Sequence, residues 1–348
     1  VDPSVVADSI GWQGVAPEEL IDRVETERQE LQRSGEVVSN REAHRVVAKV
    51  KKWFDAAPAQ WIKRPDLMNA LGDLYADLGP GFLQLACECF ERAISEPDPD
   101  DRASIHTIEH LANVEARLGE ANNDAALIAR AIDRLEQLVH LTGATATSKR
   151  AGMLGGAWKR KATVHARAYL SDASSKAKAA ELARMRDALA RSAEAYDAAA
   201  SKPGAKEIRP YPTLNWLFLW SLTAPADQRA QYLPHVQCCA AAANAAFCDD
   251  PDARNSTLVA DAALVSALLD GSLATPTADA ALDHLASDYA DALNSAMVSP
   301  KERDSVVTHI AMMALLYRAL EQASGADAEH SVGARLDGLV RRLAKAAH

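Results

Sequence analysis

The segment that decides the fold is residues 65–97, PDLMNALGDLYADLGPGFLQLACECFERAISEP. Apolar residues recur at helical spacing on either side of Gly79-Pro80-Gly81, and this pattern predicts two helices joined by a turn. Gly72 and Ala86 carry almost no side chain, so the two helices can lie close together in antiparallel orientation. The segment therefore predicts a helical hairpin.

This hairpin resembles a tetratricopeptide repeat. In that family an aromatic residue of each helix fills the space between the helices, as Tyr75 and Phe90 are expected to do, and a proline such as Pro97 ends the second helix. The turn is about two residues longer than the family's norm. Further helix pairs are expected downstream, with residues 105–118 against 125–141, and a long helix beginning near Leu154 against residues 182–199. Their spacing exceeds the usual period of about 34 residues, so we expect irregular repeats.

Helices are also predicted before the repeats. Pro17 begins one of them, with two acidic residues in the first turn where they favour the helix dipole, and this helix ends near Gly35. Ser39 and Glu42 have the spacing of a capping box, which predicts a second helix that continues to Phe54.

Residues 210–220, PYPTLNWLFLW, predict a proline-initiated helix that is apolar on nearly every side. Such a helix has to be buried, so we expect it where two halves of the chain meet. Downstream helices are predicted at residues 226–247, 255–270, 276–296, 300–323 and 329–347. The sequence therefore predicts an all-α chain, an irregular tetratricopeptide-like α-solenoid of about thirteen helices.

The composition argues against several classes of protein. The chain has 348 residues, a net charge of −10 and a pI near 5.5, so it lacks the basic surplus of a dedicated nucleic-acid or anionic-membrane binder. No apolar run reaches the roughly 18–20 residues of a membrane span, and residues 1–4 do not begin a signal peptide. The chain does not begin with Met, which is typical of a fragment or a processed chain and leaves room for a domain before Val1.

The cysteines indicate a reducing compartment. They are odd in number and fall in apolar helical stretches, which favours small buried side chains in the cytoplasm over a disulfide framework. The five residues are Cys87, Cys89, Cys238, Cys239 and Cys248.

Four phrases of the sequence are similar to one bacterial family. They are residues 103–115, residues 154–160, YPTLN at 211–215 and ERDSV at 302–306, and together they span roughly two thirds of the chain. That family resembles the helical TRAF-binding region of eukaryotic stress-kinase kinases, in which a related Tyr-Pro-x-x-Asn segment lies between helix pairs. In bacteria such regions often follow a caspase-like CHAT protease domain. The chain thus resembles a tetratricopeptide regulatory module associated with CHAT proteases in anti-phage defence or stress signalling.

The resemblance implies a scaffold that binds a protein partner, either the protease domain or its substrate, while a linked or separately encoded protease cuts. No His-Gly pair followed by a later Cys stands in a strand pattern, so no catalytic residue is carried over, and no cofactor is implied. The implied organisation is an irregular N-terminal segment at 1–15, an N-terminal helical pair at 16–64, tetratricopeptide-like repeats at 65–204 and a C-terminal helical TRAF-binding-like region at 205–348.

A competing hypothesis is a metal-dependent hydrolase. Residues 106–110, HTIEH, have the H-x-x-E-H order of inverted zinc peptidases, in which His106 and His110 would share a metal and Glu109 would activate water. A third ligand would have to be an acid such as Glu181 or Glu194, and neither lies in a motif that indicates it. The alternative is the polar face of a repeat helix.

Two other patterns do not fit the sites that they resemble. Cys238 and Cys239 are adjacent, so on a helix they point about 100° apart and cannot hold the same ion. Residues 152–159, GMLGGAWK, lack the Ser or Thr and the preceding strand of a phosphate-binding loop. Close helix packing at small residues explains the glycines.

Residues 149–167 carry only basic charges in an otherwise acidic chain. The basic side chains are Lys149, Arg150, Lys159, Arg160, Lys161 and Arg167. An acidic peptide, a phosphate-bearing nucleotide or an RNA backbone could dock there through charge-assisted hydrogen bonds, which would make the chain a nucleotide or RNA sensor. The alternative is a solvated face that acidic residues of neighbouring helices balance.

The favoured function is a non-catalytic protein-interaction module. Asparagines in tetratricopeptide grooves clamp peptide backbones, so Asn215 is a candidate, while Trp216 and Trp220 share a face that is either core or the floor of a groove. The candidate partner-binding residues are Asn69, Asp73, Asn113, Lys159, Arg160, Lys161, Asn215 and Trp216.

Overall fold

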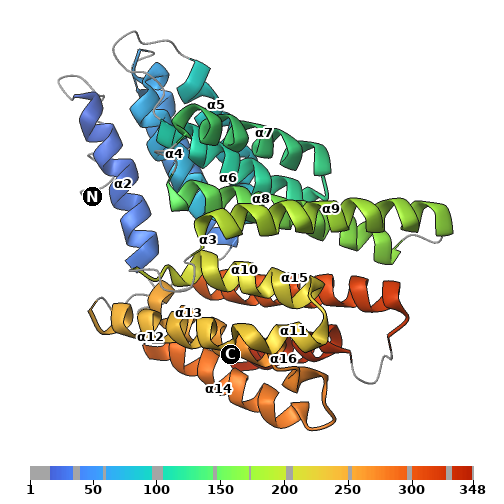
Figure 1. Cartoon of the computed structure of the whole chain (residues 1–348). Helices are drawn as coiled ribbons and strands as arrows, with labels where there is room; N and C mark the ends of the chain where they lie inside the picture. Colours follow the sequence, from blue (N-terminus) through green and yellow to red (C-terminus); the bar gives the residue numbers. More distant parts are fainter. Residues whose placement is uncertain are drawn as a thin grey trace.

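The computed structural model describes residues 16–33, 40–57, 60–95, 105–143, 147–171, 174–200, 207–249, 253–295, 300–326 and 331–346. Within these ranges the chain is almost entirely α-helical and has no strand, which confirms the predicted tetratricopeptide-like α-solenoid. Several helices pack against the next helix in the sequence as pairs. The C-terminal helices, drawn from yellow to red in Figure 1, form a second layer against the green pair of the middle of the chain.

The N-terminal elements pack on α4 (Pro65–Asp77), the first helix of the predicted hairpin. They are α2 (Pro17–Arg33), α3 (Asn40–Ala56) and the 3-10 helix η1 (Trp61–Lys63). Arg28 joins α2 to α4, because its Nε donates to Asp77 at 2.8 Å and its Nη1 donates to Asp73 at 3.3 Å. Ser39 of the predicted capping box lies outside the described residues.

The hairpin itself forms as predicted. After a turn with the 3-10 helix η2 (Pro80–Phe82), α5 (Leu83–Ser95) packs against α4. A Cβ atom on Gly72 would lie 2.7 Å from the Phe90 ring, so this approach requires glycine. Gly79, with a φ of 104°, takes a conformation that few other residues adopt, and this lets the chain turn between the helices.

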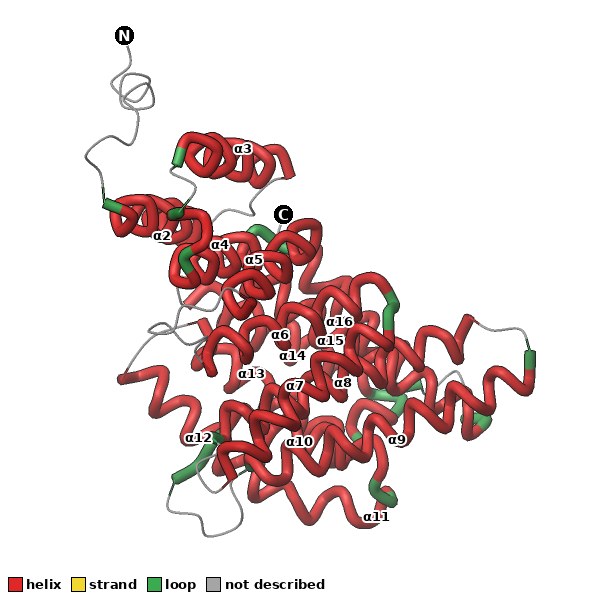
Figure 2. Tube along the Cα trace, turned by 90° about the horizontal axis from the view of Figure 1, so that it is seen from above, coloured by secondary structure: helices red, strands yellow, loops and turns green. Residues whose placement is uncertain are grey.

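Two further helix pairs follow. They are α6 (Ile105–Asn122) with α7 (Ala125–Thr142), and α8 (Ser148–Ser171) with α9 (Ser175–Ala199). Asp124 begins α7 by accepting the backbone N–H groups of Ala126 and Leu127 at 2.9 and 3.0 Å. The tip of the α8–α9 hairpin projects from the body of the molecule (Figure 2).

The remaining helices form the C-terminal layer. They are α10 (Pro210–Thr223), α11 (Ala226–Arg229), η4 (Ala230–Tyr232), α12 (Leu233–Asp249), α13 (Ala253–Leu269), η5 (Ser272–Ala274), α14 (Ala278–Ser295), α15 (Pro300–Ser324) and α16 (Val332–Ala346). The single helix predicted at 226–247 is wrong in its first part, because α11 and η4 precede α12, and Pro234 stands at the second position of α12 where no intrahelical N–H is needed.

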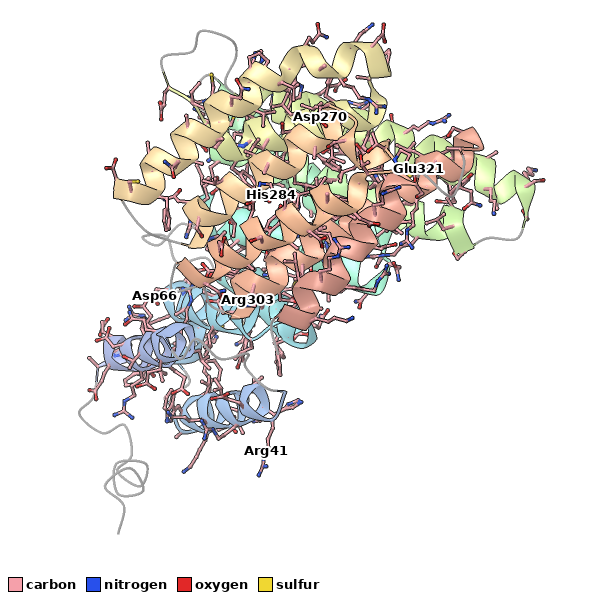
Figure 3. All side chains as sticks on the ribbon, turned by 90° about the horizontal axis from the view of Figure 1, so that it is seen from below. Arg41, Asp66, Asp270, His284, Arg303 and Glu321 are labelled. Carbon is pink, nitrogen blue, oxygen red and sulfur yellow. The ribbon has the colours of Figure 1, made fainter. Side chains whose placement is uncertain are left out.

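The junction between the last two helices is closed by Glu321, labelled in Figure 3. Its carboxylate lies near the end of α15 and accepts the Val332 backbone N–H at 2.7 Å and the Ser331 hydroxyl at 2.6 Å. It therefore satisfies donors at the N-terminus of α16, where a negative charge also suits the helix dipole.

Helix α8 contributes to two hydrophobic cores on different faces. Ala157 and Val164 pack with α6 and α7, whereas Ala162 and Ala166 belong to a core that continues through α10 to α16. The predicted burial of α10 is confirmed, since apolar side chains on several sides of it, such as Phe218, are in that core. The repeats and the C-terminal helices thus share one helix.

The burial of the cysteines was only partly predicted. Cys87 and Cys239 are buried and Cys89 is partly buried, but Cys238 and Cys248 are exposed. The expectation was wrong for these two because α12 buries only one side, on which Cys239 lies, and its other faces meet solvent.

Among the described residues, no helix combines the length and the hydropathy that crossing a bilayer would require.

Candidate functional site

The contact of α8 and α9 with α10, α13 and α15, called the seam below, is built around Lys159 of α8. This lysine is only 3% exposed. Its ammonium donates to Oδ1 of Asn215 on α10 at 2.5 Å and lies 5.6 Å from the ring centre of Tyr196 and 6.0 Å from that of Phe218. Two predicted site residues that are 56 positions apart, Lys159 and Asn215, are therefore in contact.

Asn215 is oriented by its own helix. Its side-chain N–H donates to the carbonyl oxygen of Tyr211, one turn earlier, at 3.0 Å, which leaves Oδ1 to accept from Lys159. A lysine ammonium has three N–H donors, and among the described residues no carboxylate lies at ion-pair distance from this one. Burial, with a smaller effect of the Arg160 charge, lowers the pKa of Lys159 to about 7.

Asp261 of α13 faces Lys159 across the seam without pairing with it. Its Oδ1 instead accepts the hydroxyl of the buried Tyr289 of α14 at 2.6 Å. Burial raises the pKa of Asp261 to about 6, and the Tyr289 hydrogen bond and the Lys159 charge oppose this rise. Asn215, Asp261 and His309 line a cavity of about 10 Å³, roughly the space that one water molecule needs.

The repeat side of the seam carries a surplus of positive charge. Arg160 pairs with Glu120 at 3.1 Å, whereas Arg117 donates to the Ala76 carbonyl at 3.5 Å and to no other described residue. Burial, followed by the Arg160 charge, lowers the pKa of Arg117. His309 of α15 lies opposite, and burial together with the charges of Lys159 and Arg160 holds its pKa well below 6.5. The seam therefore joins two helical layers through an interior lysine that no described carboxylate pairs with.

Such an arrangement responds to charge. Because an ammonium in a water-poor interior loses its hydration and gains only a neutral acceptor, the closed seam is less stable than an apolar contact of the same shape. These groups can hold two helical layers together, and the stability of that contact changes with the charge on Lys159.

The basic segment does not form an open basic patch. Arg150 makes a buried ion pair with Glu109 at 2.7 Å, and Arg160 and Arg167 share Glu120 at 3.1 and 3.6 Å. Acidic residues of α6 therefore balance the basic residues of α8. Of the others, Lys149 is exposed, while Lys161 lies 4.7 Å from the Trp158 ring centre and lines an open cleft of about 460 Å³ beside His165 and Arg184.

The H-x-x-E-H residues do not converge on one point. The rings of His106 and His110 are tilted by 52° with their centres 3.9 Å apart, and Nδ1 of His110 lies 2.7 Å from Oδ1 of Asp73 on α4. Glu109 is one residue from His110, hence about 100° around the helix, and it pairs with Arg150. Glu181, a suggested third ligand, lies 2.7 Å from Nδ1 of His165. No group of three or more potential ligands that could hold a metal is present among the described residues.

The predicted partner-binding residues of the first helices lie along one polar stripe. Asn69 and Asp73 are one turn apart on α4, and Asp73 contacts His110, which is followed nearly one turn later on α6 by the exposed Asn113. Oδ1 of Asn69 is buried and has no hydrogen-bond partner. Partner binding at these residues stays a prediction.

Trp216 lies on a different side of α10 from Asn215. Its ring packs edge-on against Tyr232 with centres 5.5 Å apart, and Trp220 does the same at 5.2 Å. Both tryptophans are partly buried and pack against the C-terminal core, so this face belongs to the core rather than to a groove floor.

Asp261, Tyr289 and His309 were not anticipated from the sequence. Each belongs to a helix predicted only by position, and no motif surrounds it. The sequence pattern that could have indicated them is a single ionisable residue in a mostly apolar stretch, as with Asp261 in LVADAALV and His309 in VVTHIAMM. That pattern indicates an interior polar group but does not name its partner.

Comparison with known proteins bears on the repeats. Residues 83–220 match the family described as Tetratricopeptide Repeats-Sensor (TPR-S), a range that runs from the first residue of α5 into α10 and covers less than half of the chain. No curated protein matches the chain. The middle of the chain is thus similar to tetratricopeptide repeats of the sensor type, and a protein-interaction or sensor role is the class of function that this similarity supports.

Proposed function

We propose that this chain is a non-catalytic module that binds a protein partner and thereby controls a caspase-like CHAT protease, in the cytoplasm, in bacterial defence or stress signalling. The observation that carries the proposal is the match of residues 83–220 to sensor repeats, because this range includes both Lys159 and Asn215 of the seam. A sensor needs a joint between its binding region and the rest of the chain, and the position of the seam between two helical layers supports this role.

The geometry of the polar groups supports a role without catalysis. The interior polar side chains of the seam surround a cavity of only about 10 Å³, which admits no organic substrate. Glu109, needed as the base of a metal-dependent hydrolase, is paired with Arg150. Three arginines of the basic segment are paired with glutamates of α6, which favours protein binding over nucleotide or RNA binding at this segment.

The polar stripe of α4 and α6 is the proposed contact for the partner. Asn113 is exposed, so its amide can pair with an extended peptide backbone, whereas the Asn69 oxygen is buried and has no hydrogen-bond partner among the described residues. Asp73 is already held by Arg28 and His110, which fixes the stripe in place.

The test mixes the purified chain with a CHAT protease domain purified from the same organism. We expect a complex in size-exclusion chromatography and a changed rate of cleavage of a reporter peptide. Asn113→Arg should weaken the complex at least tenfold, whereas Asn122→Arg, at an exposed site at the end of the same helix, should not. A chain that neither binds the protease nor alters its cleavage would overturn the protease role, and equal binding by both variants would remove the stripe from the interface.

A further inference from the structure

We propose that the seam is a reversible latch, which opens to expose the Lys159 ammonium to water, so that the charge on Lys159 sets how readily the C-terminal helices separate from α8. This inference goes beyond the proposed function and does not depend on the identity of the partner. It rests on the burial of Lys159, on the neutral acceptor that it contacts and on the separate engagement of the nearest carboxylate.

Burial of the Lys159 ammonium raises the free energy of the closed seam. Lys159 is 3% exposed, and within the described part of the chain its one hydrogen-bond acceptor is the Asn215 amide. Asp261 could have neutralised it, but its Oδ1 instead accepts the Tyr289 hydroxyl at 2.6 Å. An ammonium in that position is better solvated in water than in the seam, so its charge favours opening.

The Lys159 charge lies at the contact between the two helical layers. Lys159 lies on α8, whereas its acceptor Asn215 and the nearby Asp261 and His309 come from α10, α13 and α15 of the C-terminal layer. A charge buried inside either layer would destabilise that layer alone. Here it lies between the two layers, so it acts on their separation.

The shifted pKa values of the neighbouring groups lie outside the pH range in which Lys159 is expected to titrate. The groups that face it are Arg117 and Glu120 of α6, Arg160 of α8, Tyr196 of α9, Asp261 of α13 with Tyr289 of α14, and His309 of α15. The pKa of His309 lies well below 6.5, that of Asp261 is about 6, and those of both tyrosines are raised well above 10. Asn215 and Phe218 of α10 do not titrate.

The sign of the effect follows from linkage. In the closed seam the pKa of Lys159 is about 7, and in the open seam the ammonium regains its ordinary value of 10.5. Opening is therefore accompanied by proton uptake between these values, and the equilibrium constant for opening falls by roughly tenfold for each pH unit above 7. Below pH 7 the lysine is charged in both states and this dependence ends.

Hydrogen exchange on the full chain tests the latch. We expect amides of α8 and α15, after correction for the intrinsic rate, to show an opening constant that falls by roughly tenfold per unit between pH 7.5 and 9.5. Lys159→Met should slow exchange at pH 7.5 and abolish the dependence on pH. Lys161→Met, two residues away beside the Trp158 ring, is the matched control and should behave as the unaltered chain.

An opening constant of the unaltered chain that does not change from pH 7.5 to 9.5 would overturn the latch, and this measurement needs no variant. Faster exchange in Lys159→Met that persists in the double variant Lys159→Met with Asn215→Leu would also overturn it. In the double variant no unpaired amide oxygen remains, so the faster exchange would show that the lysine holds the seam closed.

Discussion

Arg150 of α8 and Glu109 of α6 form an ion pair that is almost wholly buried. The Nη2 atom of Arg150 lies 2.7 Å from Oε1 of Glu109, and the two side chains are 7% and 8% exposed. Nη1 of the same guanidinium also donates to the Thr142 hydroxyl of α7 at 2.7 Å. One arginine therefore joins three helices of two successive repeats.

Removal of one partner of this pair should strongly destabilise the fold. Arg150→Met leaves the Glu109 carboxylate buried and unpaired, so we expect the free energy of unfolding to fall by about 3–5 kcal/mol. The double variant Arg150→Met with Glu109→Leu removes both charges and should recover most of this loss. Urea denaturation of both proteins checks the prediction, which fails if the double variant is no more stable than the single one.

Two glycines of α8 should respond in opposite ways to the same substitution. A Cβ atom on Gly155 would lie 2.7 Å from the Tyr196 ring, whereas one on Gly152 would lie 3.9 Å from its nearest neighbour, an atom of Tyr211. Gly155→Ala should destabilise the chain by about 1–3 kcal/mol through overpacking. Gly152→Ala should leave it unchanged or stabilise it by up to about 1 kcal/mol, because alanine favours a helix. Thermal unfolding of the two variants decides, and equal effects would contradict the α8–α9 contact.

Asp261 should make stability depend on pH in an unusual direction. Its pKa in the fold, about 6, is above its ordinary value of 3.8, so the fold favours the protonated carboxyl. The stability that this group contributes is complete below pH 4 and is lost as the pH rises through 6. Asp261→Asn should therefore gain stability relative to the unaltered chain from pH 4 to 7, by at most about 3 kcal/mol. Denaturant titrations at several pH values test this, and a constant difference would show that Asp261 does not titrate in this range.

The cysteines should divide into two groups in their rate of reaction with a thiol reagent. Cys238 and Cys248 are exposed and should react rapidly at pH 8. Burial, aided by the nearby Glu115, raises the pKa of Cys87 to about 12, and burial raises that of Cys239 to about 11, so both should react slowly. Mass spectrometry of partly labelled protein identifies the fast sites, with unfolded chain as the control in which all of them react. Fast labelling of Cys239 would contradict the packing of α12.

Local patterns predicted most of the helices. The hairpin at 65–97 was read from Gly72, Phe90 and the turn glycines, and each of these has the predicted role. The end of α6 was placed too early, at residue 118 rather than Asn122. Helix α6 ends later than predicted because Asn123, the residue after it, adopts a φ of 54°, and Asp124 then caps the next helix.

The seam could be predicted only in part. The apolar α10 indicated burial between two halves, and Lys159 and Asn215 were both candidates, but nothing in the sequence placed them in contact. The neighbouring Asp261 and His309 come from helices that follow much later in the chain. Whether residues so far apart in sequence lie close together depends on how the helical layers pack. The basic segment suggested a docking surface because the balancing acids Glu109 and Glu120 are on another helix.

Because α8 supplies side chains to two cores, a chimera with a relative that is joined on either side of α8 would disrupt one of these cores. A chimera joined after α7 would leave Ala157 and Val164 facing foreign side chains, and one joined after α9 would do the same to Ala162 and Ala166. Recombination within this architecture is therefore expected to succeed only when α8 is inherited together with the helices on both of its sides.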